Sequence, residues 1–135
     1  MRISKKKRKE VYEKCGGHCA YCGDIISFDN FQVDHIIPLR FWYITEPENA
    51  KEKANDIKNL LPACYECNHY KRALDLETFR NKWLGKLHLR IKKIPKNPRT
   101  DKGRKRKEYM QKILDKYKIT ENTPFNKVFY FEKNC

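Results

Sequence analysis

Apolar residues in the first half of the chain follow a strand-like pattern. Residues 25–37 are rich in β-branched and aromatic side chains, with Asp29 and Asn30 in the middle and Pro38 directly after them. A run of this composition with a turn-forming pair at its centre is typical of two antiparallel strands joined by a turn. The pattern therefore predicts a β-hairpin over residues 25–37.

The segments on either side of this hairpin carry other patterns. The basic residues 2–9 lead into a segment that predicts a helix ending at Gly16–Gly17, because glycines terminate helices. Residues 41–58 begin with the aromatic triplet Phe41–Tyr43 and become polar around Pro47, which predicts a loop with a short helix. We expect the aromatic triplet to pack in the small core; stacking on nucleic-acid bases is the alternative.

Helical periodicity dominates the second half. Apolar residues recur at helical spacing from Asp75, a predicted N-cap, to Ile91, so a long amphipathic helix is expected to pack on the hairpin. Residues 94–107 contain Pro, Gly and many basic residues and predict an exposed connector. Residues 127–132 favour an edge strand. Between these two segments a second helix is predicted, with one apolar face formed by Tyr109, Met110, Ile113, Leu114 and Tyr117.

Four of the six cysteines form two CxxC pairs, Cys19 with Cys22 and Cys64 with Cys67. A CxxC turn brings two sulfurs to one ion, and two such turns complete the tetrahedral thiolate site that Zn²⁺ prefers. With four sulfur ligands the ion has no open position for water, so we expect a structural zinc that stabilises the fold. The other two cysteines, Cys15 and Cys135, lie outside the pairs, and Cys15 is expected to be a buried helix residue.

Charge narrows the class of partner. The chain has 135 residues with a net charge of +14, from 31 Lys and Arg against 17 Asp and Glu. A surplus of this size favours a polyanionic partner, and nucleic acid comes before an anionic membrane. No apolar run approaches the length of a membrane span, and the first residues lack the apolar stretch of a secretory signal. We therefore expect a soluble, intracellular protein.

Asp34 and His35 carry the chemistry that phosphodiester hydrolysis needs. An imidazole accepts a proton from water near neutral pH, and a carboxylate provides an oxygen ligand for a Mg²⁺-type cation. Adjacent residues on a regular strand point to opposite faces, so both side chains serve one site only if the chain bends there. Pro38 is close enough to suggest such a bend.

Three motifs enclosed by the CxxC pairs resemble the ββα-metal core of the HNH endonucleases. They are Val-Asp-His-Ile-Ile-Pro-Leu at 33–39, Ile-Lys-Asn-Leu-Leu-Pro-Ala-Cys at 57–64 and Cys-Asn-His-Tyr-Lys at 67–71. The resemblance is specific because the residues occur in the family's order within one zinc-bounded segment, and it covers about residues 10–80. The C-terminal part also looks like the tail of short phage and bacterial members, so the resemblance implies a cytoplasmic protein of a bacterial or phage-infected cell.

The resemblance implies a role for each matching residue. His35 would be the general base, and Asp34 a ligand of the catalytic divalent metal. Asn59 would brace the hairpin and orient His35, although the long interval after His35 leaves Asn55 as an alternative. Asn68 would be the second metal ligand, with His69 as its rival. An amide oxygen at that position suits Mg²⁺ or Mn²⁺.

The resemblance to HNH endonucleases also implies that the partner is DNA. Phosphate contacts would give an affinity that falls with salt and carries little sequence information. One active site per chain favours nicking, and cleavage of both strands would need a homodimer or two successive events; a phage-encoded partner protein also stays open. The alternative function is a zinc-stabilised nucleic-acid-binding module without catalysis. The basic residues expected to contact nucleic acid are Lys5, Lys6, Lys7, Arg8, Lys71, Arg72, Arg104, Lys105 and Arg106.

Together these observations predict an α+β fold. A small ββα-metal core would be held by the four-cysteine zinc site, with flanking helices and a C-terminal helix and strand. The predicted organisation is a basic N-terminal arm at residues 1–9, the zinc-containing nuclease core at 10–93, and a basic connector with a helix and strand extension at 94–135.

Overall fold

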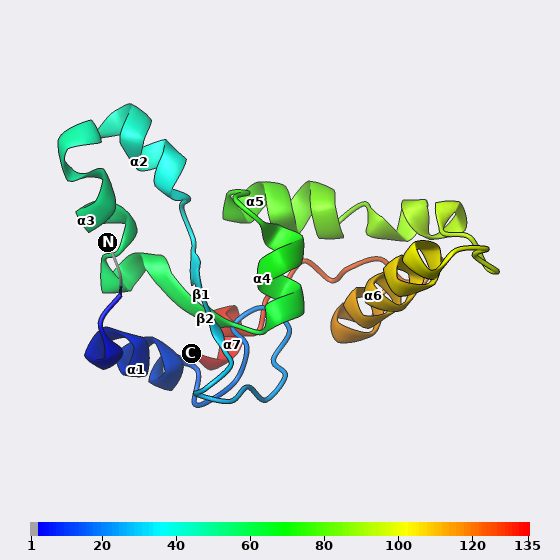
Figure 1. The fold of residues 1–135 in the computed structure, drawn as a ribbon, viewed down its shortest axis with the longest axis horizontal. Helices are drawn as coiled ribbons and strands as arrows, with labels where there is room; N and C mark the ends of the chain where they lie inside the picture. The colour runs from blue at the N-terminus through cyan, green and yellow to red at the C-terminus, as the bar shows by residue number, and fades with distance from the viewer. Residues whose placement is uncertain (1–2) are drawn as a thin grey trace. The chain divides into compact units, whose positions relative to one another are not determined.

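The computed structural model describes residues 3–135, so Met1 and Arg2, the first two residues of the predicted basic arm, lie outside it. The described chain forms two compact units. The first contains residues 3–76 and Phe129–Cys135, and the second contains Glu77–Val128. The first unit holds a two-stranded antiparallel sheet among helices and contains the four paired cysteines, which confirms the predicted α+β class (Figure 1).

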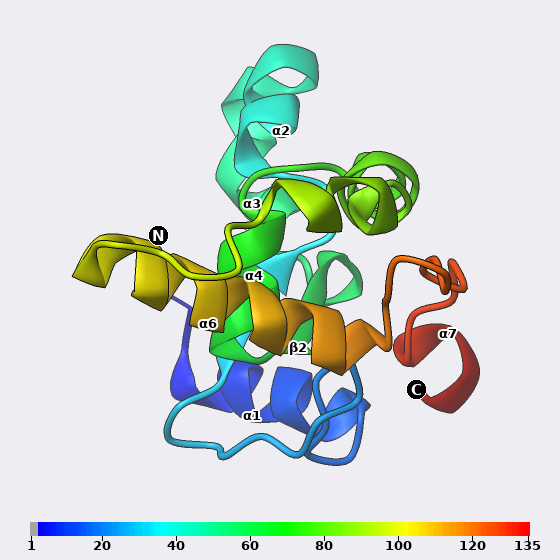
Figure 2. The ribbon, with the colours of Figure 1, turned by 90° about the vertical axis from the view of Figure 1, so that its right-hand side faces the viewer.

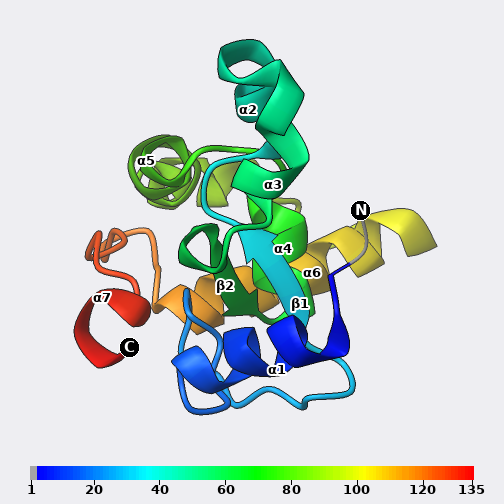
Figure 3. The same cartoon turned by 90° about the vertical axis from the view of Figure 1, so that its left-hand side faces the viewer.

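Helix α1 (Lys5–Lys14) is the first element of the first unit. It begins where the Ser4 hydroxyl accepts a hydrogen bond from the Lys7 amide, as an N-cap does. It ends before Gly16, whose φ of +59° favours glycine, so the predicted helix end is confirmed. The Lys14 ammonium donates to the carbonyl of Leu60 at 2.7 Å, which fixes the end of α1 beside strand β2 (Figure 3).

The sheet consists of β1 (Gln32–His35) and β2 (Leu60–Ala63). They run antiparallel, and His35 pairs with Leu60. The predicted hairpin over residues 25–37 is therefore wrong, because β1 pairs with β2, and 24 residues separate the two strands in the sequence. Residues 25–31 instead form turns and an isolated bridge between His18 and Ile25.

The segment between the strands is mostly helical. It contains more helix than the loop with one short helix that the sequence predicted. It contains α2 (Leu39–Thr45), η1 (Pro47–Asn49), α3 (Ala50–Ala54) and η2 (Ile57–Asn59). In Figures 1 and 3, α2 and α3 lie together beyond one end of β1. Helix α2 has no buried residue, and Phe41 and Tyr43 are exposed. The expectation that the aromatic triplet packs in the core is therefore wrong.

Helix α4 (Tyr65–Lys71) follows β2 and packs against β1, which completes the ββα arrangement. The turn that contains the first CxxC pair lies on β2, where the Ala20 amide donates to the Pro62 carbonyl at 2.8 Å. Because Pro62 has no amide hydrogen, only its carbonyl takes part in this contact. Both CxxC pairs thus lie beside the same strand.

The C-terminal segment contacts the first CxxC turn. The Phe131 amide donates to the Ala20 carbonyl at 2.7 Å and the Tyr130 amide to the Tyr21 carbonyl at 3.2 Å. Residues 131–134 form the short helix α7 (Phe131–Asn134), so the predicted strand at 127–132 is wrong. Cys15, buried as expected, forms a disulfide with Cys135, which no feature of the sequence predicted.

The second unit is helical. The predicted long helix after Asp75 is divided into α5 (Leu76–Thr78), the π-helix η3 (Phe79–Leu84) and the 3₁₀-helix η4 (Leu87–Lys93). Gly85 lies at the break, where an added Cβ would be 2.4 Å from the Asn81 carbonyl oxygen.

Helix α6 (Asp101–Tyr117) is visible as one continuous helix in Figure 2. Its predicted apolar face is confirmed, since Met110, Ile113, Leu114 and Tyr117 are buried. It begins earlier than expected, because the Thr100 side chain caps it, and residues 101–107 are therefore helical. Within residues 3–135, no helix is long and apolar enough to cross a membrane.

Candidate active site

The four paired cysteines converge in the first unit. The sulfur atoms of Cys19, Cys22, Cys64 and Cys67 all lie within 4.8 Å of one another, and those of Cys22 and Cys64 are 3.9 Å apart. Tetrahedral coordination with Zn–S bonds of about 2.3 Å places sulfurs about 3.8 Å apart, so the geometry fits one zinc ion. Hydrogen bonds from the other thiols lower the pKa of Cys64, whereas burial raises the pKa of Cys67. Sequence spacing predicted this cluster correctly.

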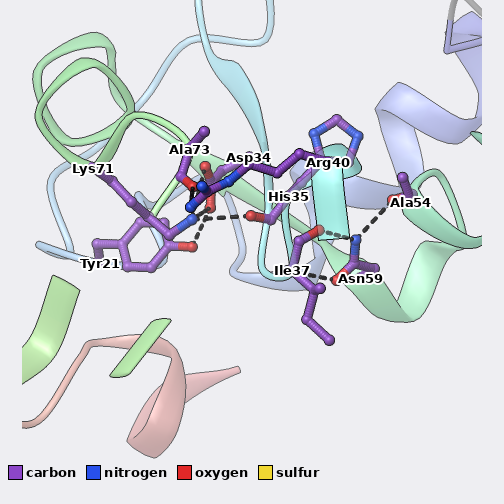
Figure 4. Close-up of polar contacts among 9 residues, drawn as sticks. All are labelled: Tyr21, Asp34, His35, Ile37, Arg40, Ala54, Asn59, Lys71 and Ala73. Carbon is purple, nitrogen blue, oxygen red and sulfur yellow. Dashed lines mark hydrogen bonds and ion pairs between the residues drawn. The ribbon is translucent and has the colours of Figure 1, made fainter. Parts of the chain in front are cut away.

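Asp34 is buried, with 3% of its surface exposed, and both of its carboxylate oxygens have partners. The Tyr21 hydroxyl donates to Oδ2, and the Lys71 ammonium lies 3.1 Å from the same oxygen and 3.4 Å from Oδ1 (Figure 4). Burial raises the pKa of Asp34, and the charge of Lys71 opposes that rise. The Tyr21 pKa is also raised, by burial and then by the Asp34 charge.

Lys71 has no exposed surface, which corrects the expectation that it contacts phosphate. Its ammonium donates to the His35 carbonyl at 3.0 Å in addition to pairing with Asp34. Burying a lysine charge requires a counter-charge and hydrogen-bond acceptors, and these two residues provide them. Lys71 is therefore a structural partner of β1 in this structure.

The His35 side chain lies on the other face of β1. It is half-buried, and its Nε2 is 2.8 Å from the Asn55 Oδ1. In Figure 4 its ring extends away from the Tyr21, Asp34 and Lys71 cluster. It lines a groove of about 960 Å³ whose other walls are residues 3–5, Arg8, residues 28–29, Val33 and Asn55.

The regular register of β1 explains this separation. Asp34 pairs with Leu61 and His35 with Leu60, so no bulge or bend interrupts the strand before its last residue. Successive side chains of a regular strand point to opposite faces. The structure therefore brings Asp34 together with Tyr21 and Lys71, and it does not bring the Asp34 carboxylate to the His35 ring.

Asn59 is buried and holds the chain on both sides of the inter-strand segment. Its Oδ1 accepts from the Ile37 amide at 2.8 Å, and its Nδ2 donates to the carbonyls of Ile37 at 3.0 Å and Ala54 at 2.9 Å (Figure 4). Its side chain contacts these backbone groups, and the contact to the His35 ring comes from Asn55. Both candidate asparagines are thus used, for different purposes.

Asn68 and His69 follow each other on α4 but lie on different sides of it. Asn68 is half-buried and precedes Lys71 by three residues, so the two share a helix face. The His69 ring is exposed and stacks on Tyr65, with ring centroids 5.6 Å apart.

The side-chain oxygens of Asp34 and Asn68 are of the kind that Mg²⁺ or Mn²⁺ prefers. In this structure the Asp34 carboxylate has no room for such an ion, because the Lys71 ammonium lies against both carboxylate oxygens. A cation would have to replace this ammonium at the carboxylate.

Two of the basic residues expected to bind nucleic acid in α1 are occupied within the protein. The Lys7 ammonium donates to the Asn55 carbonyl at 2.6 Å. The Arg8 guanidinium donates to the carbonyls of Phe28 and Phe31, at 3.0 and 2.9 Å, and lies over the Phe31 ring. Lys5 and Lys6 are exposed, as are Arg72 in the first unit and Lys105 and Arg106 in the second. Arg104, also exposed, forms an ion pair with Asp101.

Sequence reasoning missed Tyr21 and weighed Asn55 only as an alternative to Asn59. Tyr21 lies inside the first CxxC pair, where the spacing drew attention only to the cysteines. Its hydrogen bond to Asp34 follows from the position of the CxxC turn on β2, which the local sequence does not show.

Comparison with known proteins gives a family match, a sequence relative and a similar solved structure. Residues 19–73 match the family model described as HNH endonuclease. The chain is 36% identical over 64 residues to the CRISPR-associated endonuclease Cas9 of Corynebacterium diphtheriae (strain ATCC 700971 / NCTC 13129 / Biotype gravis), a match that covers 47% of this chain and 5% of that protein. The crystal structure of the Type II-C Cas9 enzyme from Actinomyces naeslundii matches at 19% identity with a TM-score of 0.44, covering 92% of this chain and 12% of that one. The chain thus spans a small part of the length of both relatives.

Zinc content tests the four-cysteine cluster. We expect about one zinc per chain in the purified protein, and Cys67→Ser should lose the metal and the cooperative unfolding of the first unit, because metal binding contributes folding free energy. Cys135→Ser is the control for zinc content: it breaks the disulfide with Cys15 and so lowers stability, but it leaves the four-cysteine cluster intact and should retain zinc. Elemental analysis and thermal unfolding measure both. A folded, zinc-free Cys67→Ser protein would contradict the assignment.

The Asp34–Lys71 pair should have a measurable effect on the free energy of unfolding. Lys71→Met leaves a buried carboxylate without its counter-charge and should cost about 3–5 kcal/mol at neutral pH. The exposed Lys58→Met should change the free energy of unfolding by no more than about 0.5 kcal/mol. Urea unfolding of both variants measures the difference.

The pH dependence of that cost has a defined sign. Without Lys71 the pKa of Asp34, already raised by burial, rises further. The folded state then binds the proton more tightly than the unfolded state, so the cost is full above the raised pKa and shrinks as pH falls through it. Adding Asp34→Asn to Lys71→Met should recover stability at neutral pH. A cost that is independent of pH would contradict this account.

Proposed function

We propose that the protein hydrolyses phosphodiester bonds of DNA with His35 as the general base, because residues 19–73 match the family model described as HNH endonuclease. The observation that carries the proposal is the position of His35. Its ring lines a groove at the end of β1, inside the matched segment, and Lys5 lines the same groove. A phosphate in this groove would meet a proton acceptor and a positive charge together.

The proposed reaction begins with a water molecule next to the scissile phosphate. The His35 imidazole takes a proton from this water as it attacks phosphorus, and the bond to the leaving oxygen breaks. When bound, a divalent metal would neutralise charge on the phosphate and on the leaving oxygen. We propose Asp34 and Asn68 as its ligands and Mg²⁺ or Mn²⁺ as the ion. This requires the Lys71 ammonium to leave Asp34 and the end of β1 to rearrange so that the carboxylate reaches the side of the strand that carries the His35 ring.

DNA would be held mainly through its phosphates. Lys5 and Lys6 are exposed at the start of α1, and Arg72 is exposed directly after α4. In the second unit, Arg104, Lys105 and Arg106 form a second exposed basic group on α6. Contacts of this kind give an affinity that falls steeply with salt and little sequence preference. One base per chain supports nicking as the product.

One observation favours a second candidate, a zinc-stabilised nucleic-acid-binding module without catalysis. The Asp34 carboxylate is occupied by Lys71 and lies on the opposite face of β1 from the His35 ring. A pure binder needs no metal at Asp34, so this pairing would be permanent. The two candidates differ in whether Mg²⁺ or Mn²⁺ produces cleavage.

Cleavage assays on supercoiled plasmid distinguish the nuclease from the non-catalytic binding module. We expect nicking that requires Mg²⁺ or Mn²⁺, and His35→Ala should lower the rate about 10²–10⁴-fold while leaving salt-sensitive DNA binding nearly intact. His88→Ala in the second unit is the matched control and should cut at the normal rate. Gel electrophoresis measures cleavage and fluorescence anisotropy measures binding. Cutting by His35→Ala at the normal rate would overturn the assignment of the base, and a wild-type protein that binds but never cuts would favour the binding module.

Asn68 and His69 give opposite expectations. Asn68→Ala should reduce cleavage on the order of 10²-fold and raise the Mn²⁺ concentration required, because it removes a metal ligand. His69→Ala should change neither by more than about twofold, since its ring stacks on Tyr65 at the surface. Cleavage rates measured over a range of Mn²⁺ concentrations give both quantities. The reverse pattern would transfer the ligand role to His69.

A further inference from the structure

Within residues 3–135, the His35 ring has a side-chain hydrogen bond to Asn55, and this contact determines which ring nitrogen is free. The Asn55 Oδ1 lies 2.8 Å from Nε2. A carbonyl oxygen only accepts hydrogen bonds, so the neutral His35 ring donates through an Nε2 proton. Its Nδ1 then has no proton and carries the lone pair. Of the two ring nitrogens, Nδ1 is therefore the one that can take a proton from water.

Asn55 is itself fixed from two directions. The backbone amide of Asn55 donates to the Lys51 carbonyl at 3.0 Å, so Asn55 is the C-cap of α3. Its carbonyl accepts from the Lys7 ammonium of α1 at 2.6 Å. These contacts hold the backbone of Asn55 and so limit the positions that its side-chain oxygen can reach.

The preceding residue adds a third restraint. The Ala54 carbonyl accepts a hydrogen bond from the Asn59 Nδ2 at 2.9 Å. Asn59 also binds the backbone at Ile37, two residues after His35. One buried side chain thus fixes the strand end that carries the base and the helix end that carries its partner.

We propose that Asn55 is a positioning residue for His35 and that Lys7 acts through Asn55, from a helix far away in the sequence. The contact to the ring stands on the observed geometry, and its catalytic meaning rests on the proposed function. The proposal gives Lys7 a role that a phosphate contact would not have. It also separates the two asparagines: Asn59 holds the backbone, and Asn55 holds the ring.

Lys7 of α1 is well placed to hold Asn55 beside the His35 ring. The groove beside His35 is lined by Ser4, Lys5 and Arg8 of the same N-terminal segment. Lys7 is half-buried, whereas Lys5 is exposed. The first turn of α1 therefore directs one ammonium inward to Asn55 and another outward along the groove.

Nuclear magnetic resonance of the full chain tests the contact without relying on cleavage. Long-range ¹H–¹⁵N spectra of protein with ¹⁵N-labelled histidine, recorded at one pH at which the ring is neutral, show which His35 nitrogen carries the proton. We expect the wild-type ring to carry it on Nε2 with slowed exchange. Asn55→Leu should lose the slowed exchange, Asn55→Asp should retain it because an acceptor oxygen remains, and Lys7→Met should weaken it.

Plasmid nicking by the same variants tests the catalytic meaning. Asn55→Leu should lower kcat about 10–100-fold with little change in KM, the usual cost of removing a group that orients a reactive ligand. Asn55→Asp should recover most of kcat. Asn49→Leu is the matched control, because Asn49 is exposed in the same inter-strand segment and its side chain makes no capping hydrogen bond.

The outcomes are distinguishable. An Asn55→Leu protein that is folded and keeps both the slowed Nε2 proton and the wild-type kcat overturns the inference. If Asn55→Leu does not fold, an Asn55→Asp or Lys7→Met protein decides: loss of the signal in Asn55→Asp, or an unchanged signal and kcat in Lys7→Met, overturns it. A wild-type protein that shows the contact but cuts no DNA contradicts the proposed function instead.

Discussion

The buried side chain of Asn59 determines the geometry around the candidate base. One amide group makes three hydrogen bonds, to the amide and carbonyl of Ile37 and to the carbonyl of Ala54. An unsatisfied buried backbone group costs about 1–3 kcal/mol, so these bonds stabilise the chain near the end of a short sheet. Because the three bonds come from one residue, the start and the end of the inter-strand segment are fixed together. The positions of His35 and Asn55 follow from this restraint.

The two-residue periodicity of β1 places the second constraint on the site. Asp34 and His35 are neighbours in sequence, yet their side chains enter different environments: a buried cluster with Tyr21 and Lys71 for one, and an open groove for the other. Lys71 connects the two, since its ammonium binds the Asp34 carboxylate and the His35 carbonyl. The ammonium thus supplies the positive charge that the buried carboxylate requires. Any cation that binds Asp34 has to meet the same electrostatic requirement and exchange with it.

Local sequence signals predicted those features that depend on neighbouring residues. Capping and glycine conformation determine the end of α1, helical spacing determines the apolar face of α6, and the CxxC spacing determines the four-cysteine cluster. The features that failed depend on distant partners. β1 pairs with a segment that contains Pro62, a poor strand former, so the more strand-like residues 25–31 were favoured as its partner.

The C-terminal segment failed for a related reason. Residues 127–132 have the β-branched and aromatic side chains of a strand, but Tyr130 and Phe131 donate their amides to a turn rather than to a neighbouring strand. Strand propensity describes how side chains fit a sheet and does not provide a partner for the backbone. Asn55 and Asn59 could not be separated for the same reason, since their hydrogen-bond partners lie in β1, α1 and the segment after β1.

The basic N-terminal segment shows most clearly how structure changes the meaning of a charge run. By composition alone, all of its lysines and arginines are equivalent contacts for phosphate. Helix formation makes them different: Lys7 and Arg8 turn toward the protein, where they bind backbone carbonyls, while Lys5 and Lys6 turn toward solvent. Val11, one turn after Lys7 and Arg8, lies on the same inward face of the helix and is fully buried. The inward pair holds Asn55 and the loop that ends at Phe31, and both border the groove that contains His35. The helix that presents charge to this groove is therefore also part of the framework that gives the groove its shape.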